Sequence, residues 1–447
     1  MASRPHSRLR QSLEMAQKMS ALLMVVLAAC TAGSSATPLA PTGVASELWT
    51  MYRGDLARDG HPPSATLDAG TAVRLRLAWR TRLDGAVDGT PVVSAGVVYV
   101  ASAGGTVAAL DSATGKTRWS RHGLGAIAGS PTVAERQLFV GTLAGTIYAL
   151  HADDGTDAWR WQGPPNVSIW ASPAVYREVL VIGLASPYGD TPLVAGSLVG
   201  LDVATGRERW TLCVRRGCEP GDGVWSTPAV DKQGIAFVGV GNPDDGVLAF
   251  DPLTGARRWF ASLYPDQGHD LDVGASPIVY MLGGREVVAQ ASVQGLFAVL
   301  DAASGASVWS RHLVQGSAVH GLLASPAYDG ANIYAVSASP PTGMFAVRAS
   351  DGAVIWRHET AGPVYSAPAV GKGTVVFGTG AVFGDLNAGS VIALSTADGH
   401  QLWSYDTHSA VRSGPALAGA DFVVVGDYAG DVLAFRPNGA MAAWTQA

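Results

Sequence analysis

A segment of about fifteen residues that ends in tryptophan recurs along the chain, and this repeat restricts the fold more than any other feature. The first clear copy is Gly105-Thr-Val-Ala-Ala-Leu-Asp-Ser-Ala-Thr-Gly-Lys-Thr-Arg-Trp119. In each full copy apolar residues alternate, an Asp or its substitute follows, and the Trp stands four residues after a turn glycine. Alternation is typical of strands, and glycine favours a hairpin turn because it adopts positive φ without steric cost. The other copies span residues 145–159, 196–210, 246–259, 295–309, 344–356 and 389–403, and a looser copy ends at Trp444.

A second element precedes each copy, in which a small residue and a proline lead into an apolar strand. Examples are Ser130-Pro-Thr-Val and Ser276-Pro-Ile-Val, and a further strand such as Val97-Val-Tyr-Val comes next. Proline is tolerated at the start of a strand because its missing N–H need not join the ladder. Each unit of about 40–50 residues therefore holds four short strands, which is the content of one propeller blade.

Eight such units can be counted from the recurring Trp residues. We therefore expect an all-β fold over residues 46–447, an eight-bladed β-propeller of four-stranded antiparallel blades. The strand at Trp444 is left over, and we expect it to pair with the first blade and close the ring, which removes sheet edges. Because the Trp residues share one phase of the repeat, we expect them to fill the gaps between neighbouring blades. The units start at Trp79, Trp119, Trp159, Trp210, Trp259, Trp309, Trp356 and Trp403.

The first thirty residues have the pattern of an export signal. Basic residues come first, and an uncharged apolar stretch over 21–29 then ends in Leu27-Ala-Ala-Cys30, too short for an ordinary transmembrane helix. This ending is similar to a bacterial lipobox, in which the Cys is lipidated and anchors the mature protein. A plain signal peptide with an unmodified Cys is the alternative. We predict a lipoprotein signal peptide over 1–29, a flexible tether over 30–45 and a periplasmic protein held to the outer membrane by lipid, because Thr31 resembles outer-membrane sorting.

The chain as a whole carries little charge. Charged residues make up 15% of the sequence, the net charge is -6 and the basic residues form no stripe, so nucleic acid is not expected as a partner. After the N-terminus no apolar run approaches the roughly 20 residues that span a bilayer. The lipid is therefore the only membrane contact that we expect.

Cys213 and Cys218 lie five residues apart. In an oxidising periplasm we expect them to form a local disulfide. A pair of metal ligands is the alternative, but no neighbouring His or Cys completes a tetrahedral set. The sequence has no Cys-x-x-Cys-His, so no covalently attached c-type haem is expected.

The repeat resembles that of the pyrroloquinoline quinone (PQQ) repeat family, whose unit has the form Ala-x-Asp-x-x-Thr-Gly-x-x-x-Trp. The resemblance covers nearly all of 46–447 and implies the propeller fold, but the family includes both dehydrogenases and non-catalytic scaffolds. Residues that break the repeat are therefore the candidates for a site. They are Trp170, Trp225, Asn242 in Val238-Gly-Val-Gly-Asn-Pro243, and the segment Gly268-His-Asp-Leu-Asp-Val-Gly-Ala-Ser-Pro277.

These residues resemble the active site of the quinoprotein alcohol dehydrogenases, and the last segment is most similar to the branch that oxidises polyvinyl alcohol. The resemblance implies that Trp225 stacks on PQQ, that Asn242 binds Ca²⁺, and that Asp270 is the general base and also a ligand of the metal. Asp272 would be its neighbour or a second ligand. An indole face suits a planar quinone, and oxygen ligands suit a hard cation. Without a ligand, Trp225 would plug a loop, Asn242 would form a turn, and the two Asp residues would be exposed loop carboxylates.

Three positions depart from the dehydrogenase pattern. The family's Ca²⁺-binding Glu is absent from Ala185-Ser-Pro-Tyr-Gly-Asp190, where Asp190 is the possible substitute. Val293 stands where the family has a basic residue that contacts the quinone, and the vicinal Cys-Cys pair is absent.

Two functions follow from the resemblance. The first is a PQQ- and calcium-dependent alcohol dehydrogenase that acts on a small or polymeric alcohol and passes electrons to a separate cytochrome. The second is a non-catalytic scaffold similar to the propeller lipoprotein of the outer-membrane barrel assembly machinery, with outer-membrane assembly proteins as partners. Convergence of Trp225, Asn242 and Asp270 on the central channel would favour the enzyme.

Overall fold

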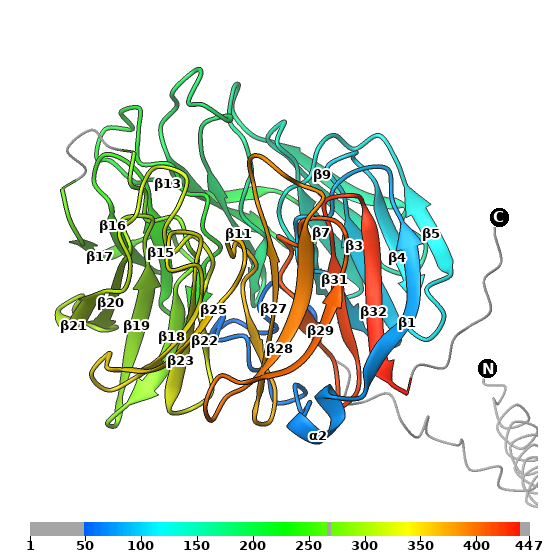
Figure 1. The fold of residues 1–447 in the computed structure, drawn as a ribbon. Helices are drawn as coiled ribbons and strands as arrows, with labels where there is room; N and C mark the ends of the chain where they lie inside the picture. The colour runs from blue at the N-terminus through cyan, green and yellow to red at the C-terminus, as the bar shows by residue number, and fades with distance from the viewer. Residues whose placement is uncertain (1–48, 266–269, 439–447) are drawn as a thin grey trace, which may run out of the picture. The chain divides into compact units, whose positions relative to one another are not determined.

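The computed structural model describes residues 49–265 and 270–438, which form eight antiparallel sheets of four strands each (Figure 1). The sheets are the blades of a β-propeller, as predicted. The predicted signal peptide and tether, and the strand expected at Trp444, lie outside these residues.

In blades 1 to 7 the strands follow chain order from the inner to the outer edge. Blade 1 has β2 (Val92–Ser94), β3 (Val97–Ala101), β4 (Val107–Asp111) and β5 (Thr117–Arg121), and blade 2 has β6 (Thr132–Ala134), β7 (Gln137–Gly141), β8 (Thr146–His151) and β9 (Asp157–Gln162). Blade 3 has β10 (Ala174–Tyr176), β11 (Val179–Leu184), β12 (Ser197–Asp202) and β13 (Glu208–Cys213), and blade 4 has β14 (Ala229–Val230), β15 (Ala236–Val240), β16 (Gly246–Phe250) and β17 (Arg257–Ser262). Blade 5 has β18 (Ile278–Leu282), β19 (Arg285–Ala291), β20 (Leu296–Asp301) and β21 (Ser307–His312). Blade 6 has β22 (Ala327–Tyr328), β23 (Asn332–Ser337), β24 (Gly343–Arg348) and β25 (Val354–Glu359), and blade 7 has β26 (Ala369–Val370), β27 (Thr374–Gly380), β28 (Gly389–Ser395) and β29 (Gln401–Asp406).

Blade 8 closes the ring with strands from both ends of the described chain. It contains β30 (Ala416–Leu417), β31 (Val423–Gly426) and β32 (Asp431–Pro437), and its outer strand is β1 (Leu75–Arg82), which pairs antiparallel with β32 (Figure 1). Arg82 forms an ion pair of 2.6 Å with Asp431 across this pairing. The recurring Trp residues therefore mark the outermost strand of each blade rather than its first strand, which corrects the phase of the predicted units but not their number.

The recurring Trp residues join neighbouring blades, as predicted. Nε1 of Trp119, for example, donates to the carbonyl of Ala152 in the next blade at 2.9 Å. A methyl group built at Gly155 would lie 2.5 Å from the same indole, so the turn glycine also leaves room for the Trp of the preceding blade. The same pairing of indole and turn glycine joins Trp79 to Gly115, Trp159 to Gly206, Trp210 to Gly255, Trp259 to Gly305, Trp309 to Gly352 and Trp356 to Gly399.

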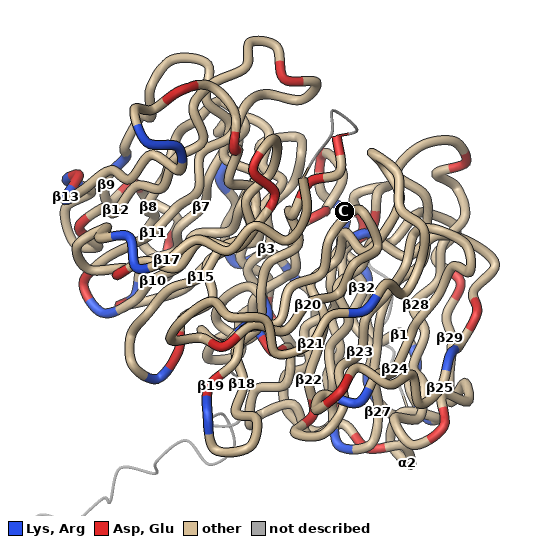
Figure 2. The backbone as a smooth tube through the Cα atoms, turned by 90° about the vertical axis from the view of Figure 1, so that its left-hand side faces the viewer, with Lys and Arg blue, Asp and Glu red and all other residues tan. Residues whose placement is uncertain are grey.

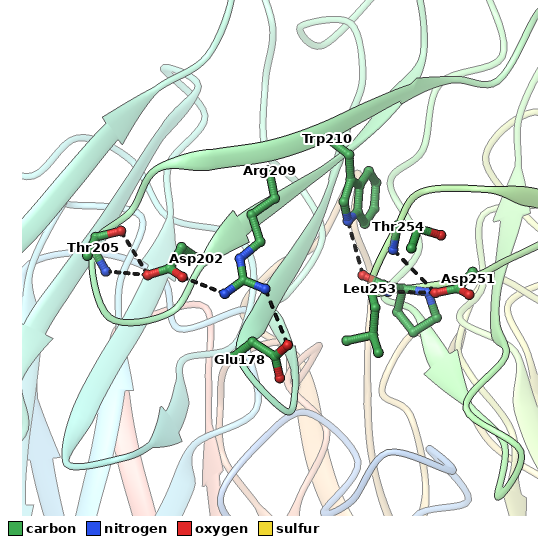
Figure 3. A network of polar contacts seen from close by, with 9 residues as sticks. Glu178, Asp202, Thr205, Arg209, Trp210, Asp251, Leu253 and Thr254 are labelled. Carbon is green, nitrogen blue, oxygen red and sulfur yellow. Dashed lines mark hydrogen bonds and ion pairs between the residues drawn. The ribbon is translucent and has the colours of Figure 1, made fainter.

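The Asp and Thr of the repeat stabilise the turn whose glycine contacts the Trp of the preceding blade (Figure 3). Asp202 Oδ1 accepts from the backbone N–H of Thr205 at 3.0 Å and from its hydroxyl at 2.8 Å. Arg209 donates to Asp202 at 2.6 Å, and the adjacent Trp210 donates to the carbonyl of Pro252 at 3.2 Å. The repeat motif is thus explained by turn geometry and contacts between blades.

The small-Pro elements form a belt of hydrogen bonds around the channel. In five successive pairs of blades, the residue before the proline donates its backbone N–H to the hydroxyl of the equivalent residue in the next blade, at 2.8–3.0 Å. Because these groups are buried, each bond satisfies a backbone donor that water cannot reach. The belt runs through Thr90, Ser130, Ser172, Thr227, Ser276 and Ser325, whereas blades 7 and 8 have Ala367 and Gly414 at this position.

Residues 49–68, which we call the strap, cross the ring at the other end of the inner strands (blue in Figure 1). The backbone of the strap forms hydrogen bonds with the inner strands or adjoining turns of blades 1, 2, 4, 5, 6, 7 and 8. Arg53 and Arg58 in the strap are 1% and 0% exposed. Arg58 donates to the carbonyl of Pro228 at 2.9 Å, and Arg53 donates to the carbonyls of Pro326 and Pro368. The strap therefore connects blades on opposite sides of the channel.

One short helix, α2 (Ala69–Ala72), follows the strap, and Asp68 caps it by accepting from the N–H of Thr71 at 2.7 Å. No helix in 49–265 or 270–438 is long and apolar enough to cross a membrane. Acidic and basic positions are interspersed on the loops and outer strands seen in Figure 2.

Candidate functional site

Three loops on one face of the propeller bring together residues predicted from the sequence. Trp225 lies between β13 and β14, Asn242 follows β15, and Asp270 and Asp272 lie between β17 and β18. Trp225 Nε1 donates to Asp272 Oδ2 at 3.1 Å, and the backbone N–H of Asn242 donates to Asp272 Oδ1 at 2.9 Å. Asn242 Nδ2 donates to Asp270 Oδ1 at 2.8 Å. Asp272 is therefore the centre of this cluster.

Glycines make this close approach possible. A methyl group built at Gly241 would lie 2.6 Å from Oδ1 of Asp272, and one at Gly239 would lie 2.2 Å from the carbonyl oxygen of Val273. A methyl group at Gly274 would lie 1.7 Å from the ring of Trp225. The glycines near Asn242 and Asp272 are thus required by contacts within the site.

The two carboxylates have different surroundings. The pKa of Asp272 is raised to about 6, mainly by burial and in part by the nearby charges of Asp270 and Asp190, while the hydrogen bonds from Asn242 and Trp225 oppose the shift. Asp270 is exposed and its backbone has a φ of 53°, a left-handed conformation that is uncommon for residues other than glycine. A carboxylate with a pKa near neutrality, such as that of Asp272, is suited to accept and release a proton.

Asn242 also presents an oxygen that suits a cation. Its Oδ1 is buried and has no hydrogen-bond partner, which is unfavourable unless a ligand occupies the position. Within the described ranges, no group of three or more His, Cys, Asp or Glu side chains is arranged to hold a metal ion. Because Ca²⁺ takes six to eight oxygens, water and a bound ligand would have to supply several of them.

Asp190 is not hydrogen-bonded to this cluster. It is exposed in the loop between β11 and β12, although its charge acts on Asp272. Val293 is 2% exposed, and its N–H donates to the carbonyl of Asp272 at 3.0 Å, so it supports the loop. Cys213 and Cys218 form a disulfide at the end of β13, next to the loop that carries Trp225.

A cavity of about 190 Å³ lies in the channel beside Trp225. One repeat position, three residues before the proline of each small-Pro element, contributes to its wall in every blade, and Tyr52 of the strap also lines it. We call these eight residues the channel ring. They are Asp88, Ala128, Trp170, Trp225, Gly274, Leu323, Tyr365 and Arg412.

Only two side chains of the channel ring, Trp170 and Trp225, were candidates from the sequence. Asp88 and Arg412, which are the two charged residues that the described part of the chain contributes to the cavity wall, were not predicted, and neither was the aromatic Tyr365. Their shared distance from the proline is visible in the sequence. Only the structure shows that the residue at this position faces the channel.

One protein-family model matches most of this chain. The PQQ_2 family model, described as outer membrane protein assembly factor BamB, matches residues 66–239, 225–341 and 294–447. The chain belongs to the PQQ_2 repeat family. Membership agrees with the eight-bladed propeller and leaves the activity open, because one fold supports several functions.

Two curated relatives of this PQQ_2 chain are polyvinylalcohol dehydrogenases. The one from a Pseudomonas species is 25% identical over 378 residues, which are 69% of this chain and 59% of that protein. The one from a Sphingopyxis species is 28% identical over 222 residues, which are 39% of this chain and 33% of that protein. The chain thus spans less than two thirds of the length of either relative.

Solved structures show the same fold at low identity. The quinohemoprotein alcohol dehydrogenase from Comamonas testosteroni has a TM-score of 0.77 and 18% identity, covering 90% of this chain and 82% of that chain. BamB from Moraxella catarrhalis has a TM-score of 0.62 and 17% identity, covering 81% of this chain and 99% of that chain. These likenesses establish the fold alone.

Proposed function

We propose that this PQQ_2 protein is a PQQ- and calcium-dependent oxidoreductase of the alcohol dehydrogenase type. The observation that carries the proposal is the hydrogen-bonded cluster of Trp225, Asn242 and Asp272 beside a channel cavity. A scaffold needs neither a buried carboxylate with a raised pKa nor an unpartnered amide oxygen there. The two polyvinylalcohol dehydrogenase relatives support the same class of reaction.

The residues present fit the cofactor in two respects. The indole of Trp225 lies in the cavity wall and offers a stacking surface, and Oδ1 of Asn242 is a buried acceptor without a partner. PQQ, when bound, would supply the redox chemistry, and Ca²⁺ would polarise it as a Lewis acid. The positions of Asp190 and Val293 differ from the dehydrogenase pattern, so the cation and the anionic groups of PQQ need other partners in this chain.

Within this proposal Asp272, rather than Asp270, accepts the proton of the alcohol. Asp272 is held by two donors and borders the indole, and its pKa of about 6 leaves it ionised at neutral pH. Asp270 accepts a hydrogen bond from Nδ2 of Asn242 and so fixes the amide group. The other amide atom, Oδ1 of Asn242, then points away from Asp270 and remains available to a cation. The substrate, a small or polymeric alcohol, and a separate cytochrome as electron acceptor complete the proposal.

We also propose that the protein is exported and anchored to the outer membrane through Cys30. The pattern at residues 1–30 supports this proposal. Mass spectrometry of the membrane fraction would show a diacyl or triacyl Cys30 as the mature N-terminus. An unmodified mature N-terminus at another residue would exclude the anchor.

One observation favours a second function, an assembly scaffold. The family model carries the description of an assembly factor, and large apolar side chains are exposed on loops at the face of the site. Tyr188 is 75% exposed, Phe383 is 51% exposed and Leu193 is 50% exposed. Such side chains suit contact with another protein.

Titration of the purified protein with PQQ, with and without Ca²⁺, separates the two functions. Quenching of Trp fluorescence and the absorbance of PQQ report binding. The enzyme proposal predicts Ca²⁺-dependent binding that is lost in Trp225→Ala and weakened in Asn242→Ala, while Trp119→Phe, a change at a contact between blades, leaves it intact. Absence of binding at high micromolar PQQ would exclude the enzyme and favour the scaffold, whose partners would then be sought by affinity capture from outer membranes.

A further inference from the structure

Arg412 faces the channel from the side opposite Trp225. Both residues belong to the channel ring, Trp225 before blade 4 and Arg412 before blade 8. Four blades separate these positions on a ring of eight, so they lie across the channel from each other. A ligand that contacts Trp225 and reaches across the channel therefore meets Arg412.

The guanidinium of Arg412 is held in one orientation. Its Nε donates to Oδ1 of Asp88 at 2.8 Å, and Nη2 lies 2.7 Å from the same oxygen. The guanidinium carbon lies over the ring of Tyr428, 4.4 Å from the centre of the ring. Nη1 takes no part in the contacts with Asp88. The contacts of Nε and Nη2 therefore fix the guanidinium, while the edge that carries Nη1 can donate to another acceptor.

The pair of Arg412 and Asp88 stands between two cavities. Both residues line the cavity of about 190 Å³ beside Trp225 and a second one of about 390 Å³ next to Tyr428. The side chain of Arg412 is 17% exposed, so its charge acts in partly desolvated surroundings. In such surroundings a hydrogen bond from a charged donor is stronger than it is in open water.

A second observation points to the same place. Thr90 is 2% exposed, lines the smaller cavity, and has a buried hydroxyl oxygen without a hydrogen-bond partner. The equivalent hydroxyls of blades 2 to 6 accept a backbone N–H of the preceding blade, but the belt does not continue to Thr90 from Gly414. A methyl group built at Gly414 would lie 2.7 Å from the Thr90 oxygen, which places the hydroxyl at the junction of blades 8 and 1.

We propose that Arg412 and Thr90 form a carboxylate-binding subsite that takes a carboxylate of PQQ, with Asp88 positioning the guanidinium. The inference rests on the proposed function. PQQ is a planar tricarboxylate, and a fixed guanidinium next to a hydroxyl donor is suited to a carboxylate. The subsite supplies the positive charge that this chain lacks at Val293.

The test compares PQQ with its trimethyl ester, which keeps the ring and removes the negative charges. Dissociation constants of both are measured by fluorescence quenching in the presence of Ca²⁺ for the wild type, Arg412→Met and Thr90→Val. We expect Arg412→Met to weaken PQQ binding by about 10- to 100-fold, as for loss of a charged hydrogen bond, and Thr90→Val by about 3- to 10-fold. Binding of the ester should change less than about twofold, because it lacks the carboxylate that the subsite recognises.

Arg436→Met is the matched control. Arg436 also pairs with an acid, Asp421, at 3.3 Å and also lies over a ring, Phe422, at 4.3 Å, but it stands on β32 and does not line either cavity. Its PQQ affinity should remain that of the wild type. The double variant Asp88→Asn with Arg412→Met avoids leaving the half-buried carboxylate of Asp88 unpaired, and circular dichroism checks its fold.

The outcomes separate this inference from the proposed function. If the wild type binds PQQ and the folded double variant binds it equally well, the subsite is wrong and the enzyme proposal stands. If Arg412→Met weakens PQQ and the ester by the same factor, the effect is structural and the subsite is also wrong. If the wild type binds no PQQ, both proposals fail together.

Discussion

The indole nitrogen of Trp225 donates a hydrogen bond of 3.1 Å to Oδ2 of Asp272, a residue 47 positions later in the chain. The same indole packs on Gly274, so one side chain forms a wall of the cavity and also orients the buried carboxylate. A stacking surface and a proton acceptor are thereby linked within a single contact.

Replacing Trp225 by Phe separates these two roles. The smaller ring keeps an aromatic surface but loses the Nε1 donor, and this donor opposes the rise in the pKa of Asp272. We expect PQQ binding to weaken by less than about tenfold, whereas the pH at which activity is half-maximal shifts upward by up to about one unit. A pH profile of turnover measures the shift. An unchanged profile would show that the hydrogen bond does not act on the catalytic carboxylate.

The two neighbouring carboxylates should respond differently to neutralisation. Asp272→Asn removes the proposed proton acceptor, and we expect turnover to fall at least 100-fold. Asp270→Asn leaves Asp272 in place, so turnover should fall by less than about tenfold. In the wild type, activity should rise with pH through about 6, because Asp272 must be ionised to accept a proton. If Asp270→Asn lowered turnover more than Asp272→Asn, Asp270 would be the general base instead.

Stability should fall as the pH rises from 5 to 8. Burial and the neighbouring Asp244 raise the pKa of Asp222 to about 7, above the value of about 4 in an unfolded chain. The folded state therefore binds more protons than the unfolded state across this window, so the free energy of unfolding decreases with pH. Urea unfolding at several pH values should show a smaller decrease in Asp222→Asn than in the wild type, whereas the exposed control Asp406→Asn should show the same decrease as the wild type.

The strap should contribute strongly to stability through Arg58. Its guanidinium is fully buried and donates to the carbonyls of Pro228 at 2.9 Å and Tyr52 at 2.6 Å. Arg58→Met leaves these acceptors unpaired, and we expect a loss of about 3–5 kcal/mol. Urea unfolding measures this, with the exposed Arg76→Met as control. Equal stability of the two variants would mean that the strap is only weakly attached.

The hydroxyl belt can be tested at Ser276. Its oxygen accepts the backbone N–H of Thr227 at 2.8 Å, and both residues are buried. Ser276→Ala leaves that N–H without a partner, which costs about 1–3 kcal/mol. Thermal unfolding should show a lower midpoint than in Ser120→Ala, a change in the outer strand β5. Equal midpoints would argue against the belt.

Much of the fold could be predicted from the sequence because its information is local and repeated. The alternation of apolar residues around Val107, the turn at Gly115 and the Trp that follows require only neighbouring residues and recur in each blade. Repetition determined the number of blades, and departures from it identified Trp225, Asn242 and Asp272 as candidates. The pairing of β1 with β32, which closes the ring among the described residues, could not be predicted, because these strands come from opposite ends of the chain and are related only by tertiary structure.

The tertiary structure decided which of the candidates act together. Asp270 and Asp272 are equivalent carboxylates in the sequence, but burial and the hydrogen bonds from Trp225 and Asn242 distinguish Asp272. Arg412 and Asp88 are 324 residues apart and meet only because the ring closes. Local periodicity thus determines the blade, whereas long-range closure and desolvation determine the chemistry of the channel.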